Sequence, residues 1–546
     1  MLFRSTRETI EGLAGDPIPH YGISTGFGAL ANTFITTELR AQLQRSLVRS
    51  HAAGTGAEVE REVVRALMAN RLSTLMTART GVRTVVVETY AAMLNAGITP
   101  VVHEYGSLGC SGDLAPLSHC ALAVMGEGVV RDANGNLMDT ADAFAAVGIE
   151  PVELKEKEGL ALINGTDGML GMLVMAIDDL GHLLRVVDIS TALSVEGLLG
   201  TDKVFADDLQ ALRPHPGQRA SAANIRTLLA GSPLVHSHDN AEDTRVQDAY
   251  SLRCAPQVNG AARDTVNYAA KVAGHELNSA IDNPVVTHDY RVASNGNFHG
   301  APVAYVLDFL AIAACDVASM SERRTDRFLD KARNYGLPAF LAHEPGVDSG
   351  LMIAQYTAAG MVSEMKRLAV PASVDSIPSS AMQEDHVSMG WSAARKLRRA
   401  IDGLSRVLAV EVLTAARALD LRAPLTPAQA ASLVFVPNPN FNGSVTIGFT
   451  LTDDAGGRFA INATTGVVTV AGALDAESAT SHTITVQATS SDGSVASANF
   501  TINVTSVDEF PVLLSDGNVA ANTVAEDANE FVSKVCNGCA ADARHQ

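Results

Sequence analysis

EYGSLGCSGDLAPLSHCAL, residues 104–122, is the most informative stretch of this 546-residue chain. Gly106, Gly109 and Gly112 lie close together in it, and glycine allows turns that a side chain forbids. Asp113 and Pro116 follow where a helix can begin, because aspartate favours the position before a helix and proline favours its first turn. Taken alone, the pattern predicts a tight loop that caps a helix.

The sequence on either side of this loop, up to about residue 425, is typical of long helices. It is rich in Ala, Leu, Met, Arg and Glu. In residues 62–81 apolar side chains recur at helical spacing, which predicts an amphipathic helix. Residues 168–200 and 301–327 are apolar nearly all round, and helices of that kind lie inside a bundle or an oligomer. Residues 392–421 form another helical segment, so we expect a mainly α fold with a long central bundle.

From about residue 427 the pattern changes to alternating β-branched and polar residues, with turn residues between short runs. Such alternation predicts strands, and several short strands in succession predict an all-β sandwich. We therefore expect four parts, which are a helical domain at 1–425, a partial β repeat at 427–454, a β-sandwich at 455–512, and a partial repeat or disordered tail at 513–546.

The overall composition limits the partners and the compartment. The formal net charge of −20 argues against nucleic acid or an anionic membrane as the main partner. Residues 301–318 are strongly apolar, but Asp308 and Asp316 interrupt them, so we interpret this segment as a buried helix and not a membrane span. The first residues contain no apolar signal core. Six scattered cysteines suit a reducing cytosol better than a disulfide framework, and we expect a cytoplasmic protein.

The stretch GSLGCSGDLAPLSH resembles the signature of the aromatic amino acid ammonia-lyases and aminomutases. The resemblance implies that Cys110, Ser111 and Gly112 cyclise without help from another enzyme, losing two waters. The product is 4-methylidene-imidazol-5-one (MIO), whose methylene carbon derives from Ser111, and no external cofactor is needed. The family usually has Ala where this chain has Cys110; only backbone atoms of that residue take part, so a small side chain should be tolerated. A role for Cys110 as a thiol nucleophile is a poor alternative, because no partner histidine is evident nearby.

The reaction of this family explains why such an electrophile is needed. A β-proton of an amino acid is not acidic and an amine is a poor leaving group, and no ordinary side chain is a strong enough electrophile to change either property. A backbone-derived acceptor supplies what cofactors supply elsewhere. Helix N-termini directed at it would favour developing negative charge.

The resemblance extends through about residues 1–425 and implies a helical bundle of the fumarase and aspartase type. It also implies a homotetramer whose active sites are shared between subunits. Arg253 would bind the substrate carboxylate, since its planar fork suits bidentate recognition, although an ordinary salt bridge is the alternative. Tyr21, the implied catalytic base, could instead be a surface aromatic. The implied catalytic residues are Cys110, Ser111, Gly112, Tyr21, Asn164, Tyr250 and Glu384, and the implied substrate-binding residues are His51, Gln247, Arg253 and Phe298.

Two places indicate which amino acid is the substrate. Ser50 and His51 stand where histidine-specific members of the family have the same pair, and an imidazole side chain can exchange hydrogen bonds with a substrate imidazole. Glu384 can make a charge-assisted bond to that ring or to the amino group. The resemblance thus implies elimination of ammonia from L-histidine to give urocanate. A helix cap at His51, a phenylalanine or tyrosine ammonia-lyase, and an aminomutase are the alternatives.

The tail resembles bacterial cadherin-like repeats. Residues 474–477 resemble their calcium-binding L-D-x-E motif, and oxygen ligands of this type suit Ca²⁺. We expect no metal in residues 1–425. The rival function from another class is a calcium-binding surface adhesion module with an inert helical part. The candidate calcium ligands are Asp475, Glu477, Asp492 and Asp508.

Overall fold

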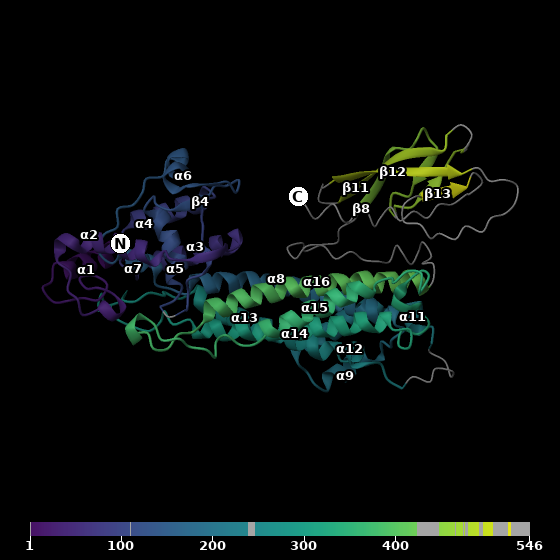
Figure 1. Ribbon diagram of the computed structural model, residues 1–546, viewed down its shortest axis with the longest axis horizontal. Coiled ribbons are helices and arrows are strands. Elements are labelled where there is room, and N and C mark those ends of the chain that lie inside the picture. Colours follow the sequence, from purple (N-terminus) through teal and green to yellow (C-terminus); the bar gives the residue numbers. More distant parts are fainter. Residues whose placement is uncertain are drawn as a thin grey trace. The chain divides into compact units, whose positions relative to one another are not determined.

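The apolar helical segments form a bundle of long helices (Figure 1). Within it α14 packs on α8, α13 and α15, and α13 also packs on α8. Buried residues of α16 belong to the same core cluster. The mainly α fold predicted from the sequence is therefore confirmed. The bundle helices are α8 (Asp167–Gly197), α13 (Ala255–Leu277), α14 (Ala301–Leu329), α15 (Met352–Leu368) and α16 (Gly390–Arg422).

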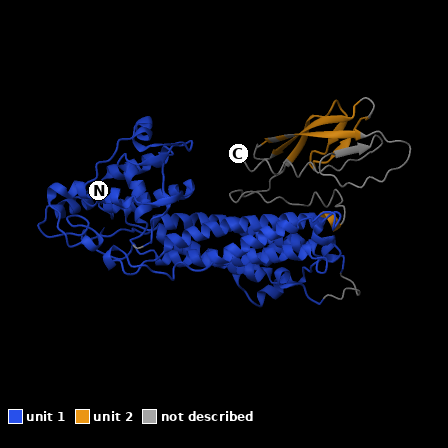
Figure 2. Cartoon of the chain, viewed as in Figure 1, with its two compact units in different colours: residues 1–419 blue, residues 420–546 orange. Residues whose placement is uncertain are grey.

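This computed structural model describes only part of the chain. Cys110 and the calcium-ligand candidates Asp475, Glu477, Asp492 and Asp508 lie outside the described residues. The chain divides into two compact units, residues 1–419 and 420–546 (Figure 2). The described residues are 2–109, 111–238, 246–422, 447–464, 466–472, 474, 479–490, 495–505 and 522–525.

Helix α14 is, among the described residues, the one helix long and apolar enough to cross a membrane by length and composition. Most of its apolar window is nevertheless buried against the rest of the bundle. Its Asp308 is buried, receives 2.8 Å bonds from Lys396 Nζ of α16 and from the Ser373 amide, and would be costly in lipid. The helix is a core element of the bundle, as the sequence predicted.

Short helices and short strands gather at the end of the bundle where α8 begins (Figure 1). Here α3 packs on α8, while α5 packs on α2 and α7. Strand β1 pairs with β3, and β4 pairs with β2 and β5, all antiparallel. The elements are α1 (Leu2–Ala14), α2 (Arg40–His51), β1 (Thr55–Glu58), α3 (Arg61–Met76), α4 (Thr84–Asn95), β2 (Thr99–Pro100), β3 (His103–Tyr105), α5 (Leu114–Val124), β4 (Val129–Arg131), β5 (Leu137–Asp139), α6 (Thr140–Val147) and α7 (Glu158–Ile163).

Shorter helices also surround the other end of the bundle, where α8 ends (Figure 1). Of these, α10 packs on α13 and α8, and α12 contacts α8, α13 and α14. The elements are α9 (Asp207–Ala211), α10 (Pro216–Leu229), α11 (Pro233–His236) and α12 (Tyr250–Arg253).

A small hairpin of β6 (Val285–Val286) and β7 (Val292–Ala293) lies between α13 and α14 in the sequence. It belongs to the end of the bundle where α8 begins, because the Val286 amide donates to the Arg79 carbonyl at 2.8 Å and Val286 is buried with Ile10 and Ile23.

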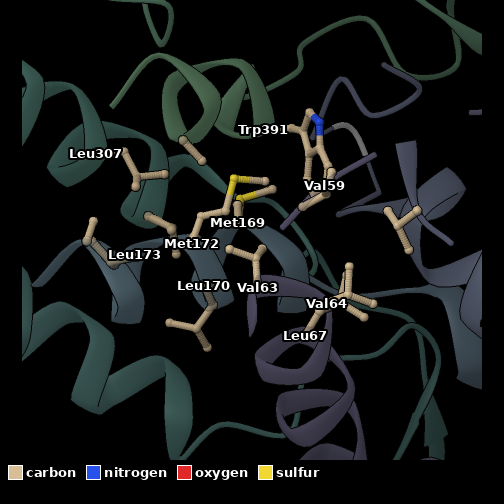
Figure 3. Close-up of a cluster of buried hydrophobic side chains, with 14 of the residues drawn as sticks. Val59, Val63, Val64, Leu67, Met169, Leu170, Met172, Leu173, Leu307 and Trp391 are labelled. Atoms are coloured by element: carbon tan, nitrogen blue, oxygen red, sulfur yellow. The ribbon is translucent and has the colours of Figure 1, made fainter. Parts of the chain in front are cut away.

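The core that joins the α3 region to the bundle consists of large apolar side chains (Figure 3). Helices α3 and α8 approach closely at Gly171, where a Cβ atom would lie 3.1 Å from the Leu67 amide nitrogen. Trp391 at the start of α16 is buried and donates its indole N–H to the Glu104 carbonyl at 2.7 Å. The contributing residues include Val59, Val63, Val64, Leu67, Met169, Leu170, Met172, Leu173, Leu307 and Trp391.

The second unit contains the strands that the tail pattern predicts. Its four-stranded sheet has the order β13-β12-β11-β8, in which β8, β11 and β12 are antiparallel and β13 is parallel to β12. A separate hairpin joins β9 and β10. Phe459, Val468, Ile484, Val486 and Ile502 form a small apolar core. The strands are β8 (Ile447–Asp453), β9 (Phe459–Ile461), β10 (Val468–Val470), β11 (Ser481–Ser490), β12 (Val495–Thr505) and β13 (Asn522–Ala525). A complete cadherin-like sandwich and the predicted domain boundaries stay predictions.

The shared core at α3 and α8 generates the first prediction. Leu67→Ala removes a fully buried side chain from this core, and we expect it to lower the free energy of unfolding by about 2–5 kcal/mol. Leu212→Ala is the control, because Leu212 is 83% exposed and its loss should change stability by less than about 0.5 kcal/mol. Denaturant unfolding measures both, and equal effects would contradict the assigned core.

Candidate active site

The predicted tripeptide lies in a loop that leaves no room for side chains at its glycines. Gly112 has φ +76° and forms a bridge with Gly165, and a Cβ atom on it would lie 2.0 Å from the Gly165 carbonyl oxygen. Gly109 has φ +66°, and a Cβ atom there would lie 2.2 Å from Ser388 Oγ. Both positions therefore require glycine. Ser111 stands between these two constrained positions.

Asp113 ties the loop to the beginnings of two helices. It precedes α5, and its Oδ2 accepts hydrogen bonds from the amides of Gly168 (2.9 Å) and Met169 (2.8 Å) in the first turn of α8. Ser107 Oγ donates to Asp113 Oδ1 at 2.9 Å. Complete burial raises the pKa of the Asp113 carboxyl to about 7 against these stabilising hydrogen bonds. The N-termini of α5 and α8 thus meet at the loop, and the helix dipoles place positive potential there.

Asn164 presents a free acceptor beside the loop. Its side chain is buried, and its Nδ2 donates to the Asn283 carbonyl at 2.9 Å. Its Oδ1 has no hydrogen-bond partner. A buried acceptor without a partner costs about 1–3 kcal/mol, so this atom is suited to a donor that a ligand brings. Asn164 directly precedes Gly165, which is bridged to Gly112, so this residue lies close to the loop.

Tyr21 lies in a loop that packs over the segment holding Asn164. A Cβ atom on Gly22 would lie 2.7 Å from Leu160 and 3.3 Å from Pro284, which follows Asn283. The Tyr21 hydroxyl accepts a long hydrogen bond from the Gly28 amide at 3.4 Å. Burial raises the pKa of Tyr21, and the nearby carboxylates of Glu384 and Asp282 raise it further.

Glu384 reaches the same place from a distant part of the sequence. It pairs with Ser379 through backbone bonds, and Ser379 Oγ donates to Glu384 Oε2 at 3.1 Å. A Cβ atom on Gly28 would lie 3.5 Å from Glu384 Oε1. The structure therefore places Glu384 against the loop that carries Tyr21.

His51 stands at the end of α2 as a neutral acceptor. Its Nδ1 lies 2.9 Å from the Leu47 carbonyl, which assigns the proton to Nδ1 and leaves Nε2 able to accept. Burial lowers the pKa of His51, while the hydrogen bond to Leu47 and the charge of Glu384 act in the opposite direction. The hydrogen bond of Nδ1 fits the alternative of a helix cap at His51, and Nε2 remains for a ligand.

Tyr250, Arg253 and Gln247 do not join this group within one chain. They lie in and beside α12 at the other end of α8, where the Thr201 amide donates to Asp248 Oδ2 at 2.7 Å. Since α8 has 31 residues, the two ends are separated by about 45 Å. Tyr250 is 70% exposed, and the Arg253 guanidinium lies 4.6 Å from the centre of its ring.

Phe298 belongs to the first end of the bundle. It is half-buried just before α14. The next residue, His299, stacks on His386 with ring centres 5.7 Å apart, two residues from Glu384. One chain thus gathers Ser111, Gly112, Asn164, Tyr21, His51 and Glu384 at one end, with Phe298 nearby.

Sequence reasoning missed Ser388 and Asn283 and treated Asp113 only as a helix start. Ser388 Oγ donates to the Gly109 carbonyl at 3.0 Å, and Asn283 orients Asn164. For Asp113 the signal was present, since an aspartate directly after the glycine loop can bond neighbouring amides. Among the described residues, no group of three or more His, Cys, Asp or Glu side chains could hold a metal ion.

Comparison with known proteins places two families on the chain. The model of the aromatic amino acid lyase family matches residues 3–436, and the model of the cadherin domain matches residues 441–505. The histidine ammonia-lyase of Streptomyces griseus is 67% identical over 432 residues, which are 79% of this chain and 84% of that protein. The histidine ammonia-lyase of Sorangium cellulosum is 48% identical over 432 residues, covering 78% and 84% of the two chains.

Solved structures of proteins of this kind also match the chain. A tyrosine aminomutase variant with a bound ligand is 40% identical with a TM-score of 0.74, and the match covers 79% of this chain and 85% of that one. The histidine ammonia-lyase of Trypanosoma cruzi is 39% identical with a TM-score of 0.71, covering 79% and 82%.

The raised pKa of Asp113 generates a prediction about stability and pH. The carboxyl titrates at its ordinary value of 3.8 when unfolded and at about 7 when folded, so the folded state binds more protons between these values. Stability should therefore fall as pH rises through this window, by up to about 4 kcal/mol from this group. In Asp113→Asn this contribution is absent, so the unfolding free energy of wild type minus that of the variant should decrease over the window.

Denaturant unfolding at several pH values measures this difference. Asp142→Asn, at an exposed position, is the control and should follow the wild type at every pH. Parallel curves for wild type and Asp113→Asn would contradict the effect of burial at this carboxyl.

Proposed function

The chain belongs to the aromatic amino acid lyase family, and we propose that it acts as a histidine ammonia-lyase whose electrophile forms from residues 110–112. The function predicted from the sequence is confirmed by histidine ammonia-lyase relatives that match most of the chain. One observation supports the residue roles above all others. The constrained Ser111–Gly112 loop, the free Asn164 acceptor, His51 and Glu384 lie at the end of the bundle where α8 begins.

The residues present fit the MIO group on which the family depends. Gly112 is pressed against Gly165, and the Gly109 position admits no side chain, so the backbone is constrained at both of these glycines. The unpaired Asn164 Oδ1 provides an acceptor beside it. When formed, the group supplies an electrophilic carbon that turns the substrate amine into a leaving group.

The side chains divide the remaining work. Arg253 holds the substrate carboxylate as a bidentate partner, and His51 Nε2 and Glu384 accept hydrogen bonds from the imidazole ring or the amino group. Tyr21 takes the β-proton at its hydroxyl oxygen, for which it must be deprotonated. The partly buried Tyr21 of a single chain has a raised pKa, and a neighbouring cation such as Arg253 would lower it in the assembled site.

We infer that two or more copies build each site, because Arg253 and Ser111 of one chain lie at opposite ends of α8. Apolar side chains on the bundle surface support this association. Tyr305, Phe309 and Ile312 follow one another at helical spacing on α14, and each is about half exposed. Ile353 and Tyr356 are exposed on α15, which packs on α14. Exposed apolar surface of this kind is typical of a symmetric interface, and we propose the family's homotetramer.

The few, scattered cysteines suit a reducing compartment, and we propose the cytoplasm as the location. Calcium binding by the second unit, which rests on the cadherin-domain match at residues 441–505, remains a prediction about residues outside the described part.

Activity and mass together test the proposed function. We expect the purified protein to turn over L-histidine with rising ultraviolet absorbance from urocanate, and its intact mass to lie two waters below the encoded mass. Ser111→Ala should remove both the mass loss and the activity, since the methylene carbon derives from Ser111. Ser73→Ala, at an exposed position on α3, is the control and should retain both.

Other products would redirect the assignment. Turnover of phenylalanine or tyrosine in place of histidine would contradict the roles of His51 and Glu384. A β-amino acid product would indicate an aminomutase. An unmodified tripeptide in folded wild-type protein would remove the catalytic proposal.

A mixing experiment tests whether the sites are shared. Ser111→Ala and Arg253→Ala should each be inactive alone, but co-expressed chains should recover activity, because one copy supplies the electrophile and another supplies the arginine. With random assembly about a quarter of the sites would be intact. Recovery is measured as urocanate formation per tetramer, and no recovery in mixed tetramers would show that each site belongs to one chain.

A further inference from the structure

Helix α12 carries Tyr250 and Arg253 and is joined to the long helix α13 by Cys254 alone. It has four residues, whereas isolated helices below about 12–15 residues are marginal in water. The chain reaches it through residues 246–249, which form no helix or strand. The C-terminal end of α12 is held by α13, and tertiary contacts must orient the rest of α12 and, with it, the guanidinium proposed to bind the substrate carboxylate.

The contact that holds α12 from beneath is made by Arg324 of α14. Arg324 is fully buried, and its Nη1 donates to the Ser251 carbonyl in α12 at 3.2 Å. Ser251 and Leu252 are themselves buried, while Tyr250 and Arg253 on either side of them face outward or remain partly exposed. The inner side of α12 is thus fixed to the bundle and its outer side presents the functional residues.

Arg324 is in turn fixed by Glu411 of α16. Nε and Nη2 of Arg324 make a two-pronged pair with the Glu411 carboxylate, with Nη2 2.9 Å from Oε2, and both side chains are fully buried. Ser190 and Ser194 of α8 donate to the same carboxylate at 3.1 and 2.7 Å. Three bundle helices therefore set the direction of one arginine, whose third nitrogen is left for α12.

The geometry of arginine is essential to this arrangement. Its planar fork can bind a carboxylate with two nitrogens and a carbonyl with the third, which a lysine ammonium cannot reproduce. Burying such a pair carries a desolvation penalty that its attraction often does not exceed. A pair of this kind is weak evidence for stability, and its bond to α12 indicates a different use.

We propose that Arg324 and Glu411 are positioning residues that set α12 so that Arg253 meets the substrate carboxylate. The stacking of Arg253 on Tyr250, 4.6 Å from the ring centre, passes the placement of the helix on to the guanidinium. The proposal rests on the proposed function, because it assumes that Arg253 binds the carboxylate.

Two inhibitors separate this role from a general loss of structure. Imidazolepropionate carries the ring and the carboxylate, and histamine carries the ring and the amine without a carboxylate. In Arg324→Lys we expect the inhibition constant of imidazolepropionate to rise about tenfold or more, and that of histamine to change by less than about twofold. The KM for L-histidine should rise together with the inhibition constant of imidazolepropionate.

Arg263→Lys is the matched control. Arg263 of α13 pairs with the buried Asp188 of α8 and donates to the Leu184 carbonyl at 2.7 Å, so the same substitution is made in another arginine–carboxylate pair of the bundle. None of these contacts involves α12, and both inhibition constants should stay within about twofold of wild type. The loss of two waters from the loop shows in every variant that the chain has folded. The substitutions do not touch this loop directly, because Ser111 lies at the opposite end of α8.

The outcomes decide the proposal. Equal weakening of both inhibitors in Arg324→Lys, or no weakening of either, would overturn it. If Arg324→Lys does not fold, Glu411→Gln, which keeps the side-chain shape, should show the same split between the inhibitors. Failure of both variants to fold beside a folded Arg263→Lys would assign the pair a structural role and also overturn the proposal. A wild-type protein without activity on L-histidine would instead refute the proposed function.

Discussion

The contact between Gly112 and Gly165 constrains the part of the molecule on which the chemistry depends. A Cβ atom on Gly112 would meet the Gly165 carbonyl, and a Cβ atom on Gly165 would meet Asp167 and Arg71. Two segments that are distant in sequence thus touch through backbone alone. The starts of α5 and α8 follow directly from this contact, and Asp113 bonds across them. Because the interior is close-packed, this contact restricts the backbone at Gly112, the residue that directly follows Ser111.

Buried charged side chains also hold together segments that are distant in sequence. Arg71 pairs with Asp167 and donates to the carbonyls of Ala161, Asn164 and Ile281, so it holds the segments on both sides of Asn164. Arg324 and Glu411 do the same for α12. In each case a charge is removed from water, which is unfavourable by itself, and its hydrogen bonds go to the backbone of an irregular segment. Loops and very short helices lack the regular bonding that places longer elements, and these charged side chains provide it.

The long helices separate the proposed functional residues as much as they support them. One end of α8 carries the loop with Ser111 and Asn164, and the other end adjoins Tyr250 and Arg253. A rigid helix of this length cannot bend to bring its ends together. A complete site therefore needs another copy of the chain, and the exposed apolar side chains on α14 and α15 offer surface for such a copy. Assembly and catalysis would then depend on the same helices.

The sequence by itself determined the helical class, the β pattern of the tail and the loop that holds the tripeptide. Helical spacing of apolar residues and the glycine pattern around Ser111 are local properties, and local physics decides them. Motif resemblance also supplied the candidate residues, from Tyr21 to Glu384. Only the tertiary structure decided which of them meet. The apolar periodicity along α14 predicts that a side chain such as Phe309 lies on an apolar helix face. It does not show whether the same chain or another copy covers that face. The free acceptor of Asn164, the burial of Asp113 and the anchoring of α12 by Arg324 likewise depend on contacts between segments far apart in sequence, and those contacts exist only once the helices have packed.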